Sequence, residues 1–304
     1  LVLRHAVNMG KGRALKDALN YYQVFLSREC SGVITADCDG QHTVEDIRRM
    51  GQAMEEHPDS LILGARDFDQ KSVPAKSRVG NKLTRTVMRL FYGGKISDTQ
   101  TGLRAIPNSL VEEYLTLPGE RFEFETAMLL TALRRKTRIE EVPIQTVYLD
   151  GNKSTHFRPV ADSWAIYKLI LGTFFKYSLS SLSSCLIDFA LFQLLLLALG
   201  SLSWEVKVTL ATVGARVCSS LYNYAVNRQL VFSRGRLGKG TFLKYYILCA
   251  AQMLCSAGGV LLFCQWARLP ELPAKIVVDG VLFFISYRIQ RNWVFAERGE
   301  KEKS

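Results

Sequence analysis

Two aspartates separated by one residue form the most chemically informative segment, Asp37-Cys-Asp39-Gly-Gln41-His42. The apolar run at 32–36 predicts a buried strand that ends at Asp37. Mg²⁺ and Mn²⁺ prefer oxygen ligands and share their coordination with substrate phosphates. Asp37 and Asp39 are therefore candidate ligands of one divalent cation that is held together with a diphosphate. Asp-x-Asp also occurs in plain turns, and His42 fits either a ligand or a packed loop histidine.

A lysine between two glycines, in Asn8-Met-Gly-Lys11-Gly-Arg-Ala14, precedes a predicted helix from Arg13 to about Leu26. Glycines at the start of a helix let the backbone approach phosphates closely, so Lys11 is a candidate donor-binding residue. The spacing of a Walker loop is missing. A plain turn before a helix explains the same residues equally well.

Basic residues follow a second predicted strand, at 61–64, in three short segments. The segments are Gly64-Ala-Arg66, Lys76-Ser-Arg78-Val-Gly-Asn81 and Asp98-Thr-Gln-Thr-Gly-Leu-Arg104. Arginine is suited to bidentate contacts with phosphate, and we expect these arginines on loops near the aspartate pair. Any one of them alone also fits a solvated surface charge.

Two further segments carry charges that fit either a functional site or a purely structural role. Glu123 and Glu125 open a predicted helix that runs through Leu133, where carboxylates are favoured by the helix dipole whether or not they serve a site. Lys153 lies between the last predicted strand, at 139–147, and the apolar half of the chain. That place suits contact with a lipid phosphate at a membrane surface.

The elements that must position these residues alternate between strand and helix. A helix is predicted at 43–56, with Ile47, Met50 and Met54 at helical spacing and Thr43 as its N-cap. Such alternation predicts an α/β domain with a mostly parallel sheet and helices on both faces. Ligands of these sheets bind at the carboxyl ends of the strands, where Asp37 is expected.

The composition divides the 304 residues into two domains, 1–167 and 168–304, because long apolar stretches dominate the second part. The mean hydropathy of +0.06 therefore describes neither domain well. The net charge of +11 does not indicate nucleic-acid binding, since the basic residues of the second part cluster between apolar stretches and no recognition module is present. The seven cysteines lack CxxC spacing and indicate neither disulfides nor a zinc site.

Four apolar segments in the second domain are each long enough to cross a bilayer core of about 30 Å as a helix. They lie at about 175–199, 206–231, 242–266 and 272–295. Cations concentrate between the second and third segments and in the tail. The positive-inside rule then predicts a multi-pass protein of the cell membrane with both termini and the first domain in the cytoplasm.

The four apolar segments contain an internal repeat. Phe175-Lys-Tyr177 recurs as Leu243-Lys-Tyr245, and the stretch from Tyr224 to Phe232 recurs from Tyr287 to Phe295. The repeat predicts two helical hairpins in the same orientation.

Three charges fall inside the apolar segments: Asp188, Arg216 and Asp279. Charges within a membrane are costly and usually face a partner or a cavity. The repeat aligns Arg216 with Asp279, and we expect Arg216 to pair with an aspartate. A structural ion pair and a role in transport remain equally open.

Five motifs occur in order within residues 1–167: Asn8-x-Gly-Lys-Gly-x-Ala14, Asp37-x-Asp-Gly-Gln-His42, Gly64-x-Arg66, Asp98-Thr-Gln-Thr-Gly-Leu-Arg104 and Asn152-Lys-Ser-x-His156-Phe157. Together they resemble glycosyltransferase family 2 enzymes of the dolichol-phosphate mannosyltransferase type. The resemblance implies a GT-A fold and inverting transfer of a sugar from a UDP- or GDP-linked donor to a polyprenyl phosphate. The endings of the repeat resemble GtrA-like proteins, which are four-helix membrane proteins associated with lipid-linked sugars.

The resemblance also implies roles for individual residues. Asp37, Asp39 and Gln41 would hold Mg²⁺ or Mn²⁺ at the donor diphosphate, and Arg66 and Arg78 would hold the acceptor phosphate, with Lys153 nearby. Asp98 would lie in the catalytic loop with support from Arg104. The expected product is an undecaprenyl- or dolichyl-linked sugar for cell-envelope polysaccharide or glycan synthesis, and a homo-oligomeric state is left open.

The sequence departs from the family pattern at its start, because the two strands that hold the nucleotide base and ribose would precede Leu1. We therefore expect a truncated catalytic domain and interpret the sequence as a fragment. The alternative is a membrane protein that translocates or presents a lipid-linked sugar and carries an inactive transferase domain. A processive polysaccharide synthase fits less well, since a Gln-x-x-Arg-Trp segment is missing.

Overall fold

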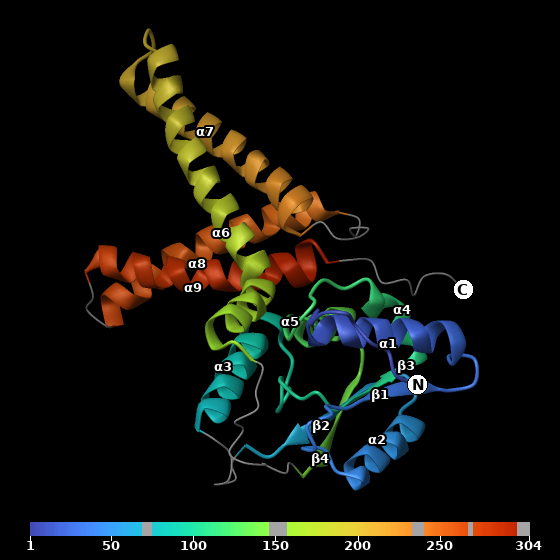
Figure 1. Ribbon diagram of the computed structural model, residues 1–304. Coiled ribbons are helices and arrows are strands. Elements are labelled where there is room, and N and C mark those ends of the chain that lie inside the picture. The colour runs from blue at the N-terminus through green and yellow to red at the C-terminus, as the bar shows by residue number, and fades with distance from the viewer. Residues whose placement is uncertain (69–74, 146–156, 233–239, 267–269, 297–304) are drawn as a thin grey trace. The chain divides into compact units, whose positions relative to one another are not determined.

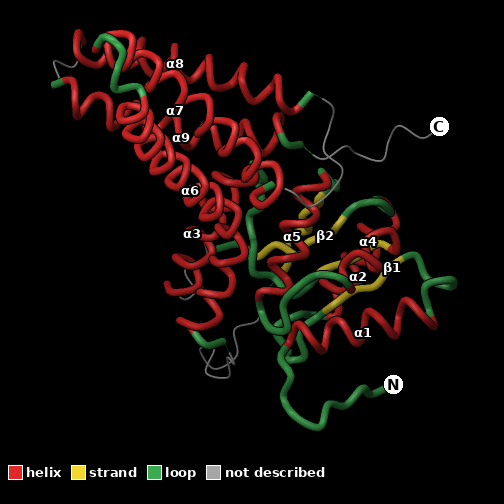
Figure 2. Tube along the Cα trace, turned by 90° about the horizontal axis from the view of Figure 1, so that it is seen from above, coloured by secondary structure: helices red, strands yellow, loops and turns green. Residues whose placement is uncertain are grey.

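The computed structural model describes residues 1–68, 75–145, 157–232, 240–266 and 270–296 (Figures 1 and 2). The chain separates into two compact units, residues 1–171 and 172–304. The first unit contains a small sheet and its covering helices, whereas the described part of the second unit is helical.

The sheet of the first unit has four strands in the order β1-β3-β2-β4: β1 (Gly32–Thr35), β3 (Arg104–Pro107), β2 (Leu61–Arg66) and β4 (Ile139–Ile144). β3 runs antiparallel to both of its neighbours, with Ile34 of β1 and Ile62 of β2 each opposite Ala105. β2 and β4 pair in parallel, with Leu61 opposite Ile139. The sheet is therefore mixed: β1, β2 and β4 run in one direction and β3 runs against them, so the expected mostly parallel sheet is not confirmed.

Both antiparallel pairings in the sheet involve the strand β3. Its four residues begin with an arginine and end with a proline, so they lack the alternating or continuous apolar pattern that identifies a strand. All four are nevertheless buried, and the strand fills the space between β1 and β2. Arg104 consequently lies in the sheet and not on a loop.

Helices cover both faces of the sheet: α1 (Lys11–Phe25), α2 (Val44–Glu56), α3 (Ala75–Tyr92), α4 (Asn108–Leu115) and α5 (Glu123–Arg135). Strand β2 shows how the faces divide, because its side chains alternate between two apolar clusters. Leu61 and Leu63 pack in the cluster that contains Phe124 of α5, and Ile62 packs in the cluster that contains Met50 of α2. Figure 1 shows α2 on one side of the strands and α1, α4 and α5 on the other.

Two helices show where pattern reading succeeded and where it failed. Thr43 is the N-cap of α2, as expected, since its hydroxyl accepts a hydrogen bond from the Asp46 amide at 3.1 Å. Helix α3 was not expected, and it places Arg78 on a helix where a loop was predicted. Met88 and Phe91 of α3 are buried and provide its core-facing positions.

Four long helices occupy the C-terminal part: α6 (Pro159–Ala198), α7 (Trp204–Val226), α8 (Thr241–Trp266) and α9 (Glu271–Ile289). Helix α6 begins in the first unit and ends in the second. The π-helical turns η2 (Asn227–Val231) and η3 (Gln290–Val294) follow α7 and α9 at equivalent places of the sequence repeat.

Within the described residues, α6 and α8 are long and apolar enough to cross a membrane. Their apolar side chains are largely exposed, for example Leu179 at 68% and Leu254 at 69%, which suits a lipid environment. Helices α7 and α9, which contain Arg216 and Asp279, fall short of the same measure. Four membrane spans thus stay a prediction.

Candidate functional site

A lysine and two carboxylates meet at the carboxyl end of β1. The Lys11 ammonium, in the first turn of α1, lies 2.7 Å from Oδ1 of Asp37 and 3.1 Å from Oε2 of Glu125. Glu125 belongs to the first turn of α5 and is only 7% exposed. Burial disfavours the charge of Lys11, but Glu125 and Asp37 outweigh it and raise the Lys11 pKa above its usual value. The three side chains form a charged cluster, which we call the Lys11 cluster.

Gly102 closes one side of the Lys11 cluster. A Cβ atom at this position would lie 2.4 Å from Oδ2 of Asp37 and 2.9 Å from the Lys11 ammonium, which leaves no room for a side chain. The Thr35 hydroxyl, at the end of β1, donates a hydrogen bond to the Gly102 carbonyl at 3.0 Å. Gly102 is therefore required by close packing against the cluster.

The other predicted metal ligands lie on the loop after Asp37. Asp39 is exposed, and its Oδ1 accepts a hydrogen bond from the Gln41 amide at 3.1 Å. Within the described residues no three His, Cys, Asp or Glu side chains gather closely enough to hold a metal ion. Two carboxylates fit the type of Mg²⁺ or Mn²⁺ site whose coordination is completed by substrate phosphates and water.

His42 lies half-buried beside this loop. Its Nδ1 is buried and makes no hydrogen bond with any residue that the structure describes. Burial, more than any neighbouring charge, lowers the pKa of His42, and Asp37 and Asp39 only partly oppose that effect. The imidazole is thus neutral near pH 7, which leaves both of its expected roles open.

The two glycines beside Lys11 serve packing in this structure. A Cβ on Gly10 would lie 2.4 Å from the Glu120 carbonyl oxygen, and one on Gly12 would lie 2.7 Å from the Arg121 carbonyl oxygen. The Arg13 amide donates to the Glu120 carbonyl at 3.0 Å. The glycines hold the start of α1 against the segment before α5, and this contact sets the position of Lys11.

A second charged pair joins Arg66 to the fully buried Asp98. The Arg66 guanidinium donates from Nε and Nη2 to the two oxygens of Asp98, at 2.6 and 3.1 Å. The backbone amides of Arg66 and Gln100 donate to the same carboxylate. Asp98 is 0% exposed. The carboxylate predicted to be catalytic thus anchors Arg66, which was predicted to bind phosphate.

Arg104 supports the Lys11 cluster from within the core. Its Nε donates to the Thr101 carbonyl at 3.0 Å, and its Nη1 donates to the Glu125 carbonyl at 2.6 Å. The side chain is 1% exposed. Arg104 therefore ties the loop that contains Gly102 to the backbone of Glu125.

The remaining predicted phosphate ligands are only partly described. Arg78 on α3 donates from Nε to the Phe68 carbonyl at 3.0 Å. Lys153 lies outside the described residues. Sequence reasoning did not select Gly102, and it left the role of Glu125 open. No pattern in the sequence around Gly102 indicated that this glycine would lie against Asp37.

The charges in the long helices pair within each hairpin. Arg216 lies 3.4 Å from Asp188, so the expected pairing with an aspartate is present, and Ser219 donates to the same carboxylate. In the other hairpin, Asp279 accepts from Ser256 at 2.6 Å and pairs with Lys275 at 2.8 Å. Asp188 follows Tyr177 at the same spacing as Ser256 follows Tyr245, so Asp188 and Ser256 are equivalent in the repeat. The Asp188–Arg216 and Ser256–Asp279 contacts therefore join equivalent positions of the two hairpins.

Polar side chains also join the two hairpins near their π-helical ends. The side-chain amide of Asn227 donates a hydrogen bond to the side-chain oxygen of Gln290 at 3.1 Å, and these two residues are equivalent in the repeat. Tyr177 of α6 accepts from Gln290, and Tyr245 of α8 donates to Asn223. Each hairpin thus contributes a tyrosine to the polar group of the other.

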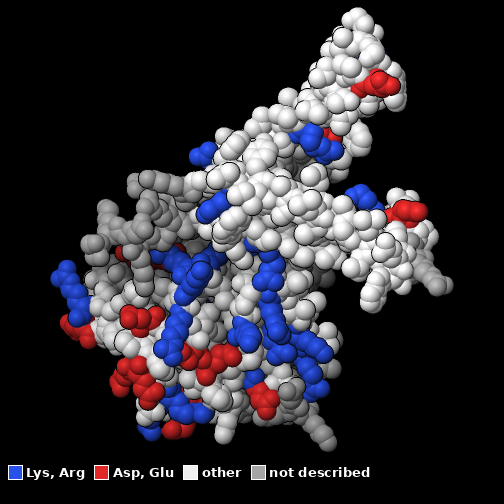
Figure 3. All heavy atoms as spheres, turned by 180° about the vertical axis from the view of Figure 1, so that it is seen from behind, with Lys and Arg blue, Asp and Glu red and all other residues white. Residues whose placement is uncertain are grey.

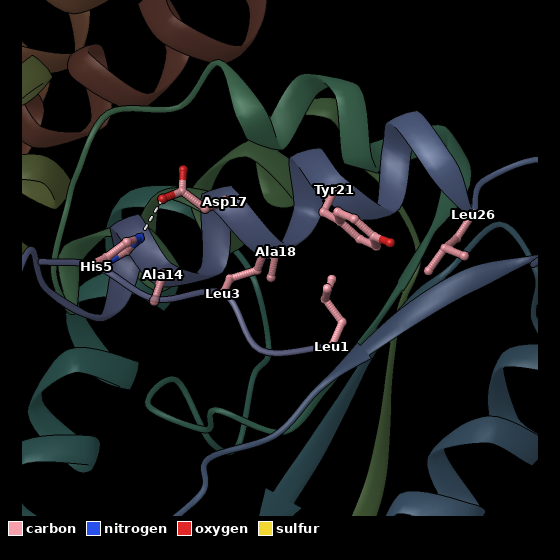
Figure 4. A pocket seen from close by; sticks show the side chains of 8 residues that line it. All are labelled: Leu1, Leu3, His5, Ala14, Asp17, Ala18, Tyr21 and Leu26. Carbon is pink, nitrogen blue, oxygen red and sulfur yellow. Dashed lines mark hydrogen bonds and ion pairs between the residues drawn. The ribbon is translucent and has the colours of Figure 1, made fainter.

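The two units also differ in surface charge, and the first unit contains a hollow. In Figure 3 charged side chains gather over the first unit, while the long helices are mostly uncharged on that face. A hollow of about 460 Å³ lies along α1, lined mostly by apolar side chains such as Leu1, Leu3 and Ala18, and bordered by the His5–Asp17 pair (Figure 4). It does not include the Lys11 cluster.

Comparison with known proteins finds one matching family model and several similar proteins. Residues 176–295 match the family model described as GtrA/DPMS, transmembrane domain. This match confirms the GtrA-like resemblance and, together with the two apolar helices, identifies a membrane protein.

Three similar proteins extend the picture. An uncharacterised protein of Methanocaldococcus jannaschii is 26% identical over 179 residues, 58% of this chain and 72% of that protein. The UDP-N-acetylglucosamine–dolichyl-phosphate N-acetylglucosaminyltransferase of Methanococcus voltae is 27% identical over 56% of this chain and 68% of its own length. A dolichyl-phosphate β-glucosyltransferase of Saccharomyces cerevisiae is 25% identical over 50% of this chain and 48% of its own length. These matches confirm the resemblance to transferases of the dolichyl-phosphate type.

Proposed function

We propose that the chain transfers a sugar from a nucleotide-sugar donor to a polyprenyl phosphate at the cytosolic face of a membrane. The Lys11 cluster carries the proposal, because it places an accessible carboxylate, a second carboxylate and a cation at the carboxyl end of a strand. Similar proteins that act on dolichyl phosphate and the apolar helices of the same chain support a lipid acceptor.

Each residue of the site has a part in this reaction. Asp37 and Asp39, with Gln41, would hold Mg²⁺ or Mn²⁺, and the bound ion would stabilise charge on the leaving diphosphate. Lys11 adds a positive charge on the same side. Arg78 and Arg66 hold the acceptor phosphate, and Lys153 lies on the segment that leads toward the membrane helices.

Asp98 and Arg104 act by position. Asp98 fixes the Arg66 guanidinium through two hydrogen bonds, and Arg104 fixes the loop that contains Gly102. The acceptor phosphate already carries negative charge, so a strong general base is not required. A single displacement with inversion at the anomeric carbon follows from direct attack by that phosphate.

The test is to incubate membranes that contain the full chain with labelled UDP- and GDP-sugars and a polyprenyl phosphate, with and without Mn²⁺. The expected result is a lipid-linked sugar whose formation needs Mn²⁺ or Mg²⁺. The matched control is Asp37→Asn/Asp39→Asn, which should yield none. Absence of product with every donor would contradict the proposal and favour a membrane protein that presents or translocates lipid-linked sugar.

A further inference from the structure

We propose that Lys11 is an exchangeable counter-ion of the donor site and that Glu125 is the positioning residue that retains it. Lys11 pairs with Asp37 until a divalent cation binds there, and it then turns to the donor diphosphate while Glu125 keeps it within reach. The inference rests on the proposed function and adds a role for Glu125 and a sequence of partners for Lys11.

The geometry gives Lys11 two partners of different character. Asp37, on a loop, has a side chain that is 33% exposed and lies 2.7 Å from the ammonium. Glu125, on a helix, has a side chain that is 9% exposed and lies 3.1 Å from it. An ammonium has three donors on a flexible stem, so it can release one acceptor and keep the other.

A divalent cation on Asp37 must compete with this ammonium. Oδ1 of Asp37 already contacts Lys11, and Oδ2 lies against Gly102. Two positive charges on one small carboxylate repel strongly at contact distance. The arrival of the metal therefore displaces the ammonium from Asp37, and a diphosphate bound with the metal offers it new acceptors.

The backbone of Glu125 is fixed, and its side chain is the more buried of the two partners of Lys11. Its backbone carbonyl accepts a hydrogen bond from the buried Arg104 at 2.6 Å, and its side chain lies in the first turn of α5. Arg104 also binds the Thr101 carbonyl. One buried arginine thus fixes Glu125 and the neighbouring wall of the cluster, so Glu125 acts on the metal site through Lys11.

The experiment is a double-mutant cycle on Mn²⁺ binding, with the full chain in detergent micelles and free Mn²⁺ measured by electron paramagnetic resonance. The four proteins are wild type, Lys11→Met, Glu125→Gln and the double variant. Lys11→Met should bind Mn²⁺ roughly tenfold more tightly, and Glu125→Gln roughly threefold more weakly, as expected for coupled sites. In the Lys11→Met background, Glu125→Gln should have no further effect.

Lys16→Met is the matched control for loss of one positive charge. Lys16 lies on the same helix, is 8% exposed, and pairs with Glu120 at 3.0 Å. It should leave Mn²⁺ affinity unchanged. At saturating Mn²⁺, Lys11→Met should bind UDP or GDP more weakly than wild type. The same substitution thus strengthens Mn²⁺ binding and weakens nucleotide binding. Thermal unfolding of every variant identifies any that fails to fold, and Lys11→Gln then replaces Lys11→Met.

Additive effects of the two substitutions, equal effects of Lys16→Met and Lys11→Met, or no Mn²⁺ binding by wild type would overturn the inference. The measurement needs no turnover, so its outcome is separate from the transfer assay. Sugar transfer with an additive cycle would leave the proposed function standing alone. A non-additive cycle without transfer would leave only the counter-ion role.

Discussion

Asp37 and Asp98 are both bound by a cation in the first unit, yet their surroundings differ. Asp98 is fully buried and accepts hydrogen bonds from two nitrogens of one guanidinium and from two backbone amides. Asp37 is partly exposed, and its cation is a flexible lysine that has a second carboxylate to return to. The difference separates a carboxylate that holds the structure from one that is available to a ligand.

The largest expected effect is on stability, from Asp98→Ala. The substitution leaves the Arg66 guanidinium without its buried carboxylate, which costs about 3–5 kcal/mol. For a chain of this size that is a decrease in Tm on the order of 10 °C. Thermal unfolding of the full chain in detergent measures it, with Asp37→Ala as the matched variant. Equal losses of Tm in the two variants would remove the distinction between the carboxylates.

The second effect is on activity, from Asp37→Asn. Loss of the carboxylate that faces the donor should lower sugar transfer about 10²–10³-fold, the usual effect of removing one group that stabilises developing charge. Its Tm should stay near that of wild type, because Lys11 retains Glu125. Initial rates with labelled donor, measured beside Tm, test both statements. A variant that unfolds early but transfers sugar normally would reverse the roles of the two aspartates.

A smaller effect is expected from Gly102→Ala, which fills the space beside Asp37. The new methyl group would displace Asp37 or Lys11 and should slow transfer about tenfold, equal to about 1.4 kcal/mol in the barrier. Gly51→Ala is the matched control: its Cβ would lie 3.8 Å from the Ile34 Cδ1 in the middle of α2, so it should stabilise the chain by about 0.5–1 kcal/mol. Unchanged kinetics in Gly102→Ala would show that the cluster tolerates movement.

The smallest effect concerns Asp46, a third carboxylate, which is 1% exposed. Burial alone would raise its pKa, but hydrogen bonds from Thr43, Arg49 and the Gln145 amide hold the pKa below the usual 3.8. A lowered pKa contributes stability above pH 3.8 that is lost as the pH falls through the folded-state value. Asp46→Asn should therefore lose about 1 kcal/mol at pH 7. Its Tm should approach that of wild type below pH 4, and a constant gap in Tm from pH 7 to pH 3 would argue against this account.

The patterns of the sequence were sufficient for elements with strong local signals. The Thr43 cap, the strand before Asp37 and the apolar helices follow from neighbouring residues alone. Strand β3 was missed because its pairing comes from distant residues of β1 and β2 and not from its own pattern.

The candidate site shows the same limit. Asp37 was identifiable from its neighbours, whereas its contact with Gly102 and the link from Lys11 to Glu125 join segments far apart in the chain. Arg104 was expected on a loop because it follows a glycine-containing segment. Backbone carbonyls of Thr101 and Glu125 accept its hydrogen bonds inside the core, and a sequence pattern does not show such acceptors.

The hydrogen bond between Asn227 and Gln290 has a consequence for assembly. Contacts between equivalent residues are the mark of a two-fold interface, which ordinarily joins two separate subunits. Here both partners belong to one polypeptide, so their association does not depend on protein concentration. The duplicated hairpin thus carries, within a single chain, a contact of the kind that would otherwise require dimerisation.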